Sequence, residues 1–214
     1  MAGSRRSAGA ASPDFSIYLE GPRDRDLLRI WALRVSGDLA KAVESHSVLL
    51  GGRQPARAID RHRRQCREYG TARALCVLDR DGLPEPAEAK SNEPGLEFFT
   101  WPRRQIESYL LVPEAILRCL AQPDTTGVIE QWIRDLVPDA GDEDAFRDMD
   151  AKRLLSERGP LRAGMKPAML SSLEPSRIAR RMRATELHDD VRALLARLQA
   201  GCGLLEPEFH VIRR

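Results

Sequence analysis

The hydrophobic positions in the first half of the chain predict strands that alternate with helices. Four short apolar runs end in turn residues or acids and are predicted to be strands: 16–20, 47–50, 74–78 and 96–99. Apolar residues at helical spacing follow the first run up to Gly37, and an arginine-rich helix is predicted over 55–69. This alternation is typical of a Rossmann-like α/β fold, with a parallel sheet and helices on both faces.

The third run, over 74–78, is the clearest strand. It is continuously apolar, as expected for a strand that is buried on both faces. The sequence Asp79-Arg80-Asp81-Gly82 follows it directly. In open α/β sheets ligands bind at the carboxyl ends of the strands, so this acidic turn is a candidate site.

From Pro102 onward the pattern is almost wholly helical. Apolar faces over 106–120, 128–137, 142–158 and 185–200 predict helices, a loop is expected over 164–175, and 208–212 is a candidate terminal strand. We therefore expect a disordered tail over 1–14, an α/β core over 15–101, and a helical layer over 102–214 that completes the domain.

Composition narrows the classes of protein. The chain is 42% hydrophobic and has no apolar run of about 18 residues, which excludes full disorder and a bilayer span. Its 34 basic and 32 acidic residues give a net charge of only +2, so a nucleic acid must be recognised by a local site. The four cysteines and four histidines lack zinc-finger spacing. The scattered spacing of the cysteines suggests a protein of the reducing cytoplasm and not a disulfide-bonded one. No membrane partner is expected.

Four acidic residues lie at or shortly after the predicted ends of the first and third strands. Glu20 closes the first strand, Asp79 and Asp81 close the third, and Asp24 begins the helix after the first strand. Carboxylates placed together repel one another unless cations share the site, and oxygen ligands favour Mg²⁺ or Mn²⁺. The alternative is that both acidic segments are ordinary solvated turns.

Several segments resemble one family. The order YLEGPRD at 18–24, LLGG at 49–52 and VLDRDG at 77–82 resembles a TOPRIM domain, whose metal-binding signature is glutamate after the first strand and D-x-D after the third. RRQIESYLL at 103–111 is similar to the R-E-I-E-N-Y-L-L segment of OLD-type (overcoming lysogenization defect) nucleases and ATPase-associated TOPRIM proteins, and Glu107 matches its central glutamate. Gln105 and Ser108 differ from that segment. Asp150-Ala151-Lys152 resembles the family's G-K element, with alanine in place of glycine.

The resemblance implies a metal-dependent DNA endonuclease that hydrolyses phosphodiesters with two Mg²⁺ or Mn²⁺ ions in each site. It implies Glu20 and Asp79 as the main metal ligands. Asp24, Asp81 and Glu107 would be further direct or water-mediated ligands. Glu20, Asp79, Asp81 and Lys152 would form the catalytic set, with the lysine offsetting charge on the phosphate.

The predicted helix over 142–158 also indicates where the Lys152 side chain points. Lys152 lies one turn from both Met149 and Leu155, which places it beside the apolar stripe that should face the sheet. The alternative is a lysine whose stem lies along the stripe while its amine reaches water. Lys166 stands in the predicted loop, where no element fixes its direction.

Larger members of the family carry an ATPase, but these 214 residues contain no G-x-x-x-x-G-K-[ST] loop. A separate ATPase subunit or domain is therefore a candidate partner.

Two other functions remain open. A haloacid-dehalogenase-like phosphatase would use Asp79 as its nucleophile, with Thr100, Lys152 and Asp189-Asp190 in its other motifs. The Asp189-Asp190 pair, however, lies in a helical pattern where that family needs a strand end. A non-catalytic partner of an ATPase would instead bind nucleic acid through the basic residues of the helix at 55–69, which are Arg57, Arg61, Arg63, Arg64 and Arg67. Such a helix face is also commonly just solvated.

Overall fold

The computed structural model describes residues 15–81, 92–120, 126–165 and 173–204. The tail expected over 1–14 and the candidate strand over 208–212 lie outside these residues, as do Lys166 and most of the loop predicted around it.

Four parallel strands form the central sheet: β1 (Phe15–Leu19), β2 (Ser47–Leu49), β3 (Arg73–Leu78) and β4 (Leu96–Thr100). Their order is β2-β1-β3-β4, and all three neighbouring pairs are parallel. β3 lies between β1 and β4, and 74–78 are buried, which confirms the prediction of an interior strand. Because the strands are parallel, the residues that follow β1, β2 and β3 all emerge at one edge of the sheet.

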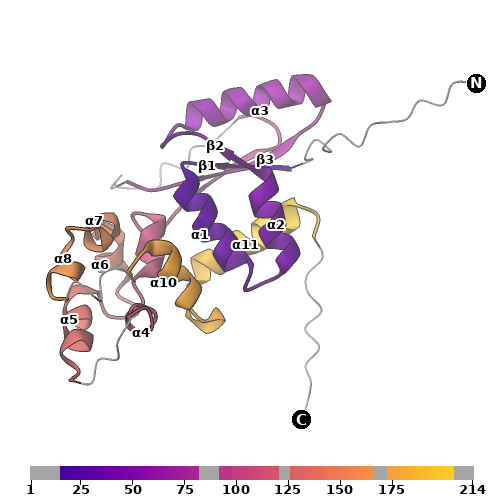
Figure 1. The fold of residues 1–214 in the computed structure, drawn as a ribbon. Coiled ribbons are helices and arrows are strands. Elements are labelled where there is room, and N and C mark those ends of the chain that lie inside the picture. Colours follow the sequence, from indigo (N-terminus) through magenta and orange to yellow (C-terminus); the bar gives the residue numbers. More distant parts are fainter. Residues whose placement is uncertain (1–14, 82–91, 121–125, 166–172, 205–214) are drawn as a thin grey trace, which may run out of the picture.

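Helices cover both faces of the sheet (Figure 1). On one face, α3 (Pro55–Tyr69) packs over alternate β3 residues, including Cys76 and Leu78. On the other face, α1 (Pro22–Ala32), α2 (Gly37–His46) and α11 (Asp189–Gly201) pack over the remaining β3 side chains, Leu75 and Val77. The alternation of β3 side chains between two apolar layers explains why its sequence is continuously apolar. The predicted Rossmann-like α/β fold is confirmed.

The segment after the first strand differs from the prediction. We expected one helix up to Gly37, but α1 ends at Ala32, and Gly37 begins α2. Ser36 caps α2, because its hydroxyl accepts a hydrogen bond from the Leu39 amide at 3.0 Å. The glycine that was interpreted as a stop is thus the first residue of a helix that the sequence analysis missed.

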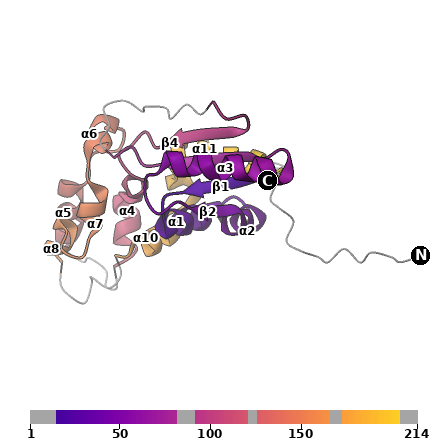
Figure 2. The ribbon, with the colours of Figure 1, turned by 90° about the horizontal axis from the view of Figure 1, so that it is seen from above.

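The rest of the described chain is a series of short helices, and those from α5 to α8 form a lobe beside the carboxyl edge of the sheet (Figure 2). The elements are η1 (Ile106–Leu110), α4 (Pro113–Leu117), α5 (Val128–Leu136), α6 (Glu143–Asp148), α7 (Ala151–Leu155), α8 (Pro160–Ala163), α10 (Pro175–Arg181) and η2 (Ala184–Glu186). The expected helical layer is therefore divided: this lobe flanks the edge, whereas α11 covers a face.

The prediction of a single helix over 142–158 is wrong. Met149 is extended and separates α6 from α7. Each helix has its own aspartate cap: Asp142 accepts from the Ala145 amide at 3.1 Å, and Asp150 accepts from the Arg153 amide at 2.9 Å. An aspartate side chain that accepts hydrogen bonds from nearby amides favours the start of a helix over its interior, so a new helix begins after Asp150. No described helix is both long enough and apolar enough to span a membrane.

Candidate functional site

Glu20 and Asp79 lie side by side at the carboxyl edge, as the topology predicted. The Asp79 amide donates a hydrogen bond to Oε1 of Glu20 at 2.7 Å. The amides of Gly51 and Gly52 donate to the Glu20 carbonyl at 2.9 and 2.8 Å. Both glycines have positive φ, of 78° and 110°, which lets the turn after β2 fold back over the edge. Three neighbouring strands therefore build this corner.

The Asp79 carboxylate is buried and held from two sides. Its Oδ1 accepts a hydrogen bond from the Ile106 amide at 2.9 Å, and its Oδ2 lies 2.6 Å from the Lys152 ammonium. The carbonyl of the same residue accepts from Nε of Arg53 at 3.0 Å. These contacts join the turn after β3 to η1, to α7 and to the loop before α3.

Glu107 is also buried, with an exposed fraction of 1%. Its Oε1 lies 3.3 Å from Arg23 on α1. Its Oε2 has no hydrogen-bond partner among the described residues, and the Lys152 ammonium lies 3.9 Å from it. Lys152 is thus placed between two buried carboxylates, Asp79 and Glu107.

The other two candidate acids occupy the rim. Asp24 is partly buried, and its Oδ2 accepts from the Gly21 amide at 2.7 Å, so it caps α1. Asp81 is exposed and has a positive φ of 52°, a conformation that aspartate tolerates better than most residues. The amides of Arg80 and Asp81 both donate to the Arg104 carbonyl, at 3.0 and 3.1 Å, and fix this turn.

Burial dominates the electrostatics of the cluster. Desolvation raises the pKa of Glu20 to about 7 and that of Asp24 to about 6, and the nearby Asp79 charge adds to both increases. Desolvation likewise raises the pKa of Asp79 and of Glu107. Desolvation alone would lower the Lys152 pKa, but the hydrogen bond to Asp79 and the negative charges of Asp79, Glu107 and Asp24 outweigh this and raise it. The site therefore holds more buried negative charge than one lysine neutralises.

The carboxylate oxygens are largely engaged within the protein. Among the described residues, no three His, Cys, Asp or Glu side chains are gathered closely enough to form a ready-made metal centre. The hydrogen bonds explain this, because Lys152 and the Ile106 amide hold Asp79, and the Gly21 amide holds Asp24. The donor set is nevertheless all oxygen, which is the chemistry of a Mg²⁺ or Mn²⁺ site.

The sequence analysis missed three residues that shape the site. Arg53 and Arg23 contact Asp79 and Glu107, and no pattern in the sequence marked either of them. Gln105 was noted only as a departure from a motif. Its side chain is buried and accepts a hydrogen bond from the Lys152 amide at 3.0 Å, so it helps to place α7.

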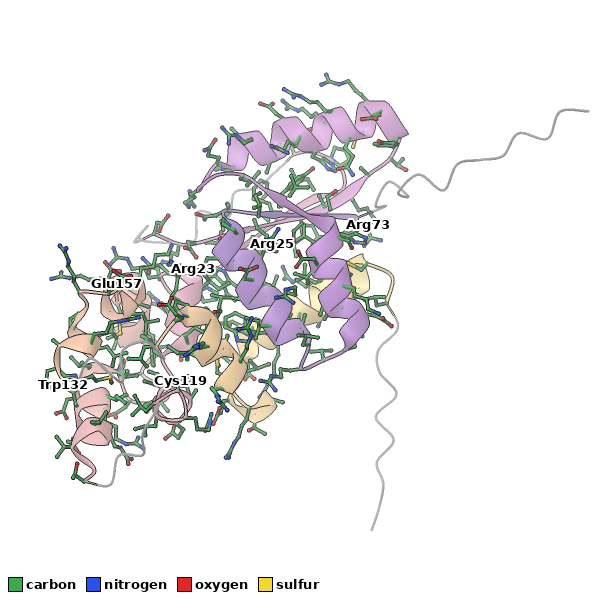
Figure 3. All side chains as sticks on the ribbon, viewed as in Figure 1. Arg23, Arg25, Arg73, Cys119, Trp132 and Glu157 are labelled. Carbon is green, nitrogen blue, oxygen red and sulfur yellow. The ribbon has the colours of Figure 1, made fainter. Side chains whose placement is uncertain are left out.

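A pocket of about 300 Å³ adjoins Glu107 and Lys152. Its wall includes three cationic side chains, from Arg23, Lys152 and Arg162, and three carboxylates, from Glu107, Glu157 and Glu174. Arg23 on α1 and Glu157 beyond α7, which both line it, are labelled in Figure 3. A phosphate group in this pocket would meet the lysine next to the carboxylates.

A polar network connects η1 and the residues just before it to α6 and α11. Arg103 pairs with Glu143 at 2.6 and 2.9 Å and stacks on the Phe146 ring at 3.8 Å. The Tyr109 hydroxyl donates to Asp190 at 2.7 Å. These contacts fix the segment that carries Glu107. They also show that Asp190 lies in α11, as predicted, and not at a strand end.

Comparisons of the chain with protein-family models, with curated proteins and with solved structures find no match.

Proposed function

We propose that this protein is a divalent-metal-dependent DNA endonuclease of the TOPRIM type, similar to the OLD-type nucleases. The observation that supports it best is that Glu20 lies against Asp79 at the carboxyl edge of the sheet, while Lys152 lies between Asp79 and Glu107. These four residues come from four separate segments and follow the order of the family's motifs.

The residues present suit a divalent cation. Glu107 keeps a buried carboxylate oxygen without a hydrogen-bond partner among the described residues, and burial raises the pKa of four nearby acids. Glu20 and Asp79 would be the main ligands of a two-ion site, with Asp24, Asp81 and Glu107 as further ones. Bound ions would polarise the phosphodiester and activate a water molecule. Binding would require Lys152 to give up its contact with Asp79.

The chain's own residues would then position the substrate. The Ile106 amide holds one Asp79 oxygen, and the Asp79 amide holds one Glu20 oxygen, so neither carboxylate turns freely. Lys152 carries a positive charge at neutral pH, as lysine ordinarily does, and it borders the pocket where a phosphate would enter. A permanent positive charge at that place stabilises the negative charge that develops during hydrolysis.

An ATPase partner remains part of the proposal. Larger members of the resembled family combine the nuclease domain with an ATPase, and these 214 residues carry no phosphate-binding loop of that kind. ATP hydrolysis would therefore come from a separate subunit or domain.

A phosphatase is the second candidate, because the contact between Lys152 and Asp79 also suits a nucleophilic aspartate whose charge is balanced by a lysine. The location of Asp189 and Asp190 at the start of a helix does not support it.

Incubation of the purified protein with supercoiled plasmid in Mg²⁺, Mn²⁺ or EDTA distinguishes these functions. We expect nicked plasmid with either metal and intact plasmid in EDTA. Hydrolysis of an aryl phosphate with the plasmid left intact would favour the phosphatase. Binding of the plasmid without cleavage under all three conditions would favour the non-catalytic partner.

A further inference from the structure

The outer face of α3 carries exposed arginines that the site does not use. They follow one another at helical spacing on this face: Arg57, Arg61, Arg64 and Arg67. Within the described segments, Arg61, Arg64 and Arg67 form no ion pair or hydrogen bond. Asp60 and Glu68 are also exposed on this helix and offset part of the charge, so the face keeps a net positive charge.

Many exposed arginines elsewhere on the molecule have acidic partners. Arg192, for example, lies 3.1 Å from Asp189. Arg134 contacts both Glu130 and Glu114. The chain has nearly as many acids as bases, so partners for arginine are abundant. Among the described residues, Arg180, Arg181 and Arg183 also lack ion pairs, so what distinguishes the arginines of α3 is that they form one row along a single helix face.

The row begins at the candidate catalytic edge. The chain passes from β2 through Gly51 and Gly52 to Arg53, whose Nε donates to the Asp79 carbonyl at 3.0 Å. Arg57 in the first turn of α3 donates to the Leu50 carbonyl at the same edge. From there α3 runs back across the sheet, and side chains with nitrogen tips stand along its outer face (Figure 3).

The length of the row suits a nucleic-acid backbone. Arg57 and Arg67 are ten positions apart, which corresponds to about 15 Å along a helix that rises 1.5 Å per residue. Each strand of duplex DNA presents one phosphate per ~3.4 Å of its axis, so the row spans roughly four base steps. Arginine binds phosphate through paired N–H groups, which makes it well suited to such contacts.

We propose that the outer face of α3 binds the phosphate backbone of duplex DNA and guides it to the carboxylate edge. The inference rests on the proposed function for its choice of DNA as the ligand. Contacts of this kind carry no sequence information, so binding through α3 is independent of base sequence and weakens as the salt concentration rises.

Two matched triple variants test this surface. R61Q/R64Q/R67Q removes three charges from α3. R180Q/R181Q/R183Q removes three charges elsewhere: Arg180 and Arg181 are the last residues of α10, and Arg183 lies two positions beyond it. All three are exposed, and within the described segments none of them forms a side-chain ion pair. The affinity for a fluorescent duplex of about 30 base pairs is measured in EDTA at several salt concentrations, so that cleavage does not intervene.

We expect the α3 variant to bind the duplex roughly tenfold to a hundredfold more weakly at moderate salt. The slope of log K against log salt should fall by about 2 to 3, because each lost phosphate contact contributes about 0.9. The α10 variant should bind like the wild type. Circular dichroism and thermal unfolding test whether both variants are folded, as expected for exposed side chains that form no ion pair among the described residues.

Equal losses of affinity in the two variants would overturn the inference, because binding would then depend on the total charge of the protein and not on where the arginines lie. Unchanged binding by the α3 variant would also overturn it. So would selective loss of binding to phosphatidylserine vesicles with DNA binding retained, since that pattern indicates a membrane surface as the partner. If the wild type binds DNA through α3 in EDTA but never nicks plasmid with metal, the proposed function fails while this inference stands.

Discussion

The Lys152 ammonium lies 2.6 Å from Oδ2 of Asp79 and 3.9 Å from Oε2 of Glu107. Asp79 and Glu107 are almost fully buried; Asp79 directly follows β3, Glu107 lies in η1 and Lys152 lies in α7. One positive charge therefore serves two buried carboxylates and connects the lobe of short helices to the sheet. Loss of that charge would leave Asp79 without an ion-pair partner in a desolvated place, and would leave Glu107 with Arg23 alone.

Lys152→Met should destabilise the protein in EDTA at pH 7.5. We expect a loss of about 1–3 kcal/mol, less than the ~3–5 kcal/mol for breaking a fully buried pair, because the Lys152 side chain is 41% exposed. Mg²⁺ should then raise the melting temperature of the variant more than that of the wild type. Urea unfolding and thermal melts measure both effects.

The control for that variant is Lys41→Met. Lys41 also pairs with an aspartate, Asp38 at 3.1 Å, but its side chain is 82% exposed, so its loss should change stability by less than about 1 kcal/mol. Equal effects of the two substitutions would mean that Lys152 does not compensate buried charge.

Glu107→Gln should weaken metal binding without unfolding the protein. The substitution removes one buried negative charge and leaves the size of the side chain unchanged. We expect roughly a tenfold to hundredfold loss of Mn²⁺ affinity, the range seen when a group that holds or orients a metal is lost. Titration calorimetry measures the affinity directly. Wild-type Mn²⁺ affinity in this variant would remove Glu107 from the site.

The stability of the metal-free protein should fall as the pH rises from about 5 to 8. Burial raises the pKa of Glu20 to about 7 and that of Asp24 to about 6, so in this range the folded state binds more protons than the unfolded state. Their favourable contribution is present at low pH and is lost as the pH rises through the folded-state pKa values. Melting temperatures in EDTA across this range measure the slope.

Glu20→Gln should reduce that slope, because a neutral amide does not titrate. Glu44→Gln is the matched control, since the Glu44 side chain is 51% exposed. A slope that is the same in the wild type and in Glu20→Gln would show that Glu20 titrates alike in the folded and unfolded states.

Asp150→Ala should slow plasmid nicking beyond its effect on stability. Asp150 caps α7, which begins with Ala151 and Lys152, so its loss should cost about 1 kcal/mol and loosen the lysine. Asp142→Ala removes the similar cap of α6 at a similar cost. We expect slower nicking only in the first variant when both are assayed well below their melting temperatures. Equal nicking rates would show that the cap does not position Lys152.

The sequence was sufficient for elements whose ends are marked by the chain itself. The helix over Pro55–Tyr69 was predicted with its observed bounds, because proline begins it and Gly70 ends it with a positive φ. β3 was recognised because both of its faces are buried. By contrast, α2 was missed, since a glycine that can end a helix can also follow a serine cap.

Lys152 shows what a local sequence pattern can and cannot predict. Its position near the carboxylates was predicted, but from a continuous helix over 142–158 that does not exist. The lysine is instead placed by the start of α7 and by the contact between its amide and Gln105. That contact joins residues 47 positions apart, as the bond from Ile106 to Asp79 joins residues 27 apart. Such pairings depend on tertiary packing, which periodicity does not encode.

The most direct test of the account is the nicking of supercoiled plasmid by Asp79→Asn in the presence of Mg²⁺ or Mn²⁺. Asparagine keeps the size of the side chain and its acceptor for the Ile106 amide, but it removes the charge that pairs with Lys152. Asp189→Asn is the control, because that aspartate is 91% exposed at the start of α11. The account predicts a loss of about a hundredfold or more in Asp79→Asn, with the protein folded, and a wild-type rate in the control. Wild-type nicking by folded Asp79→Asn would contradict the assignment of the carboxylate edge as the catalytic site.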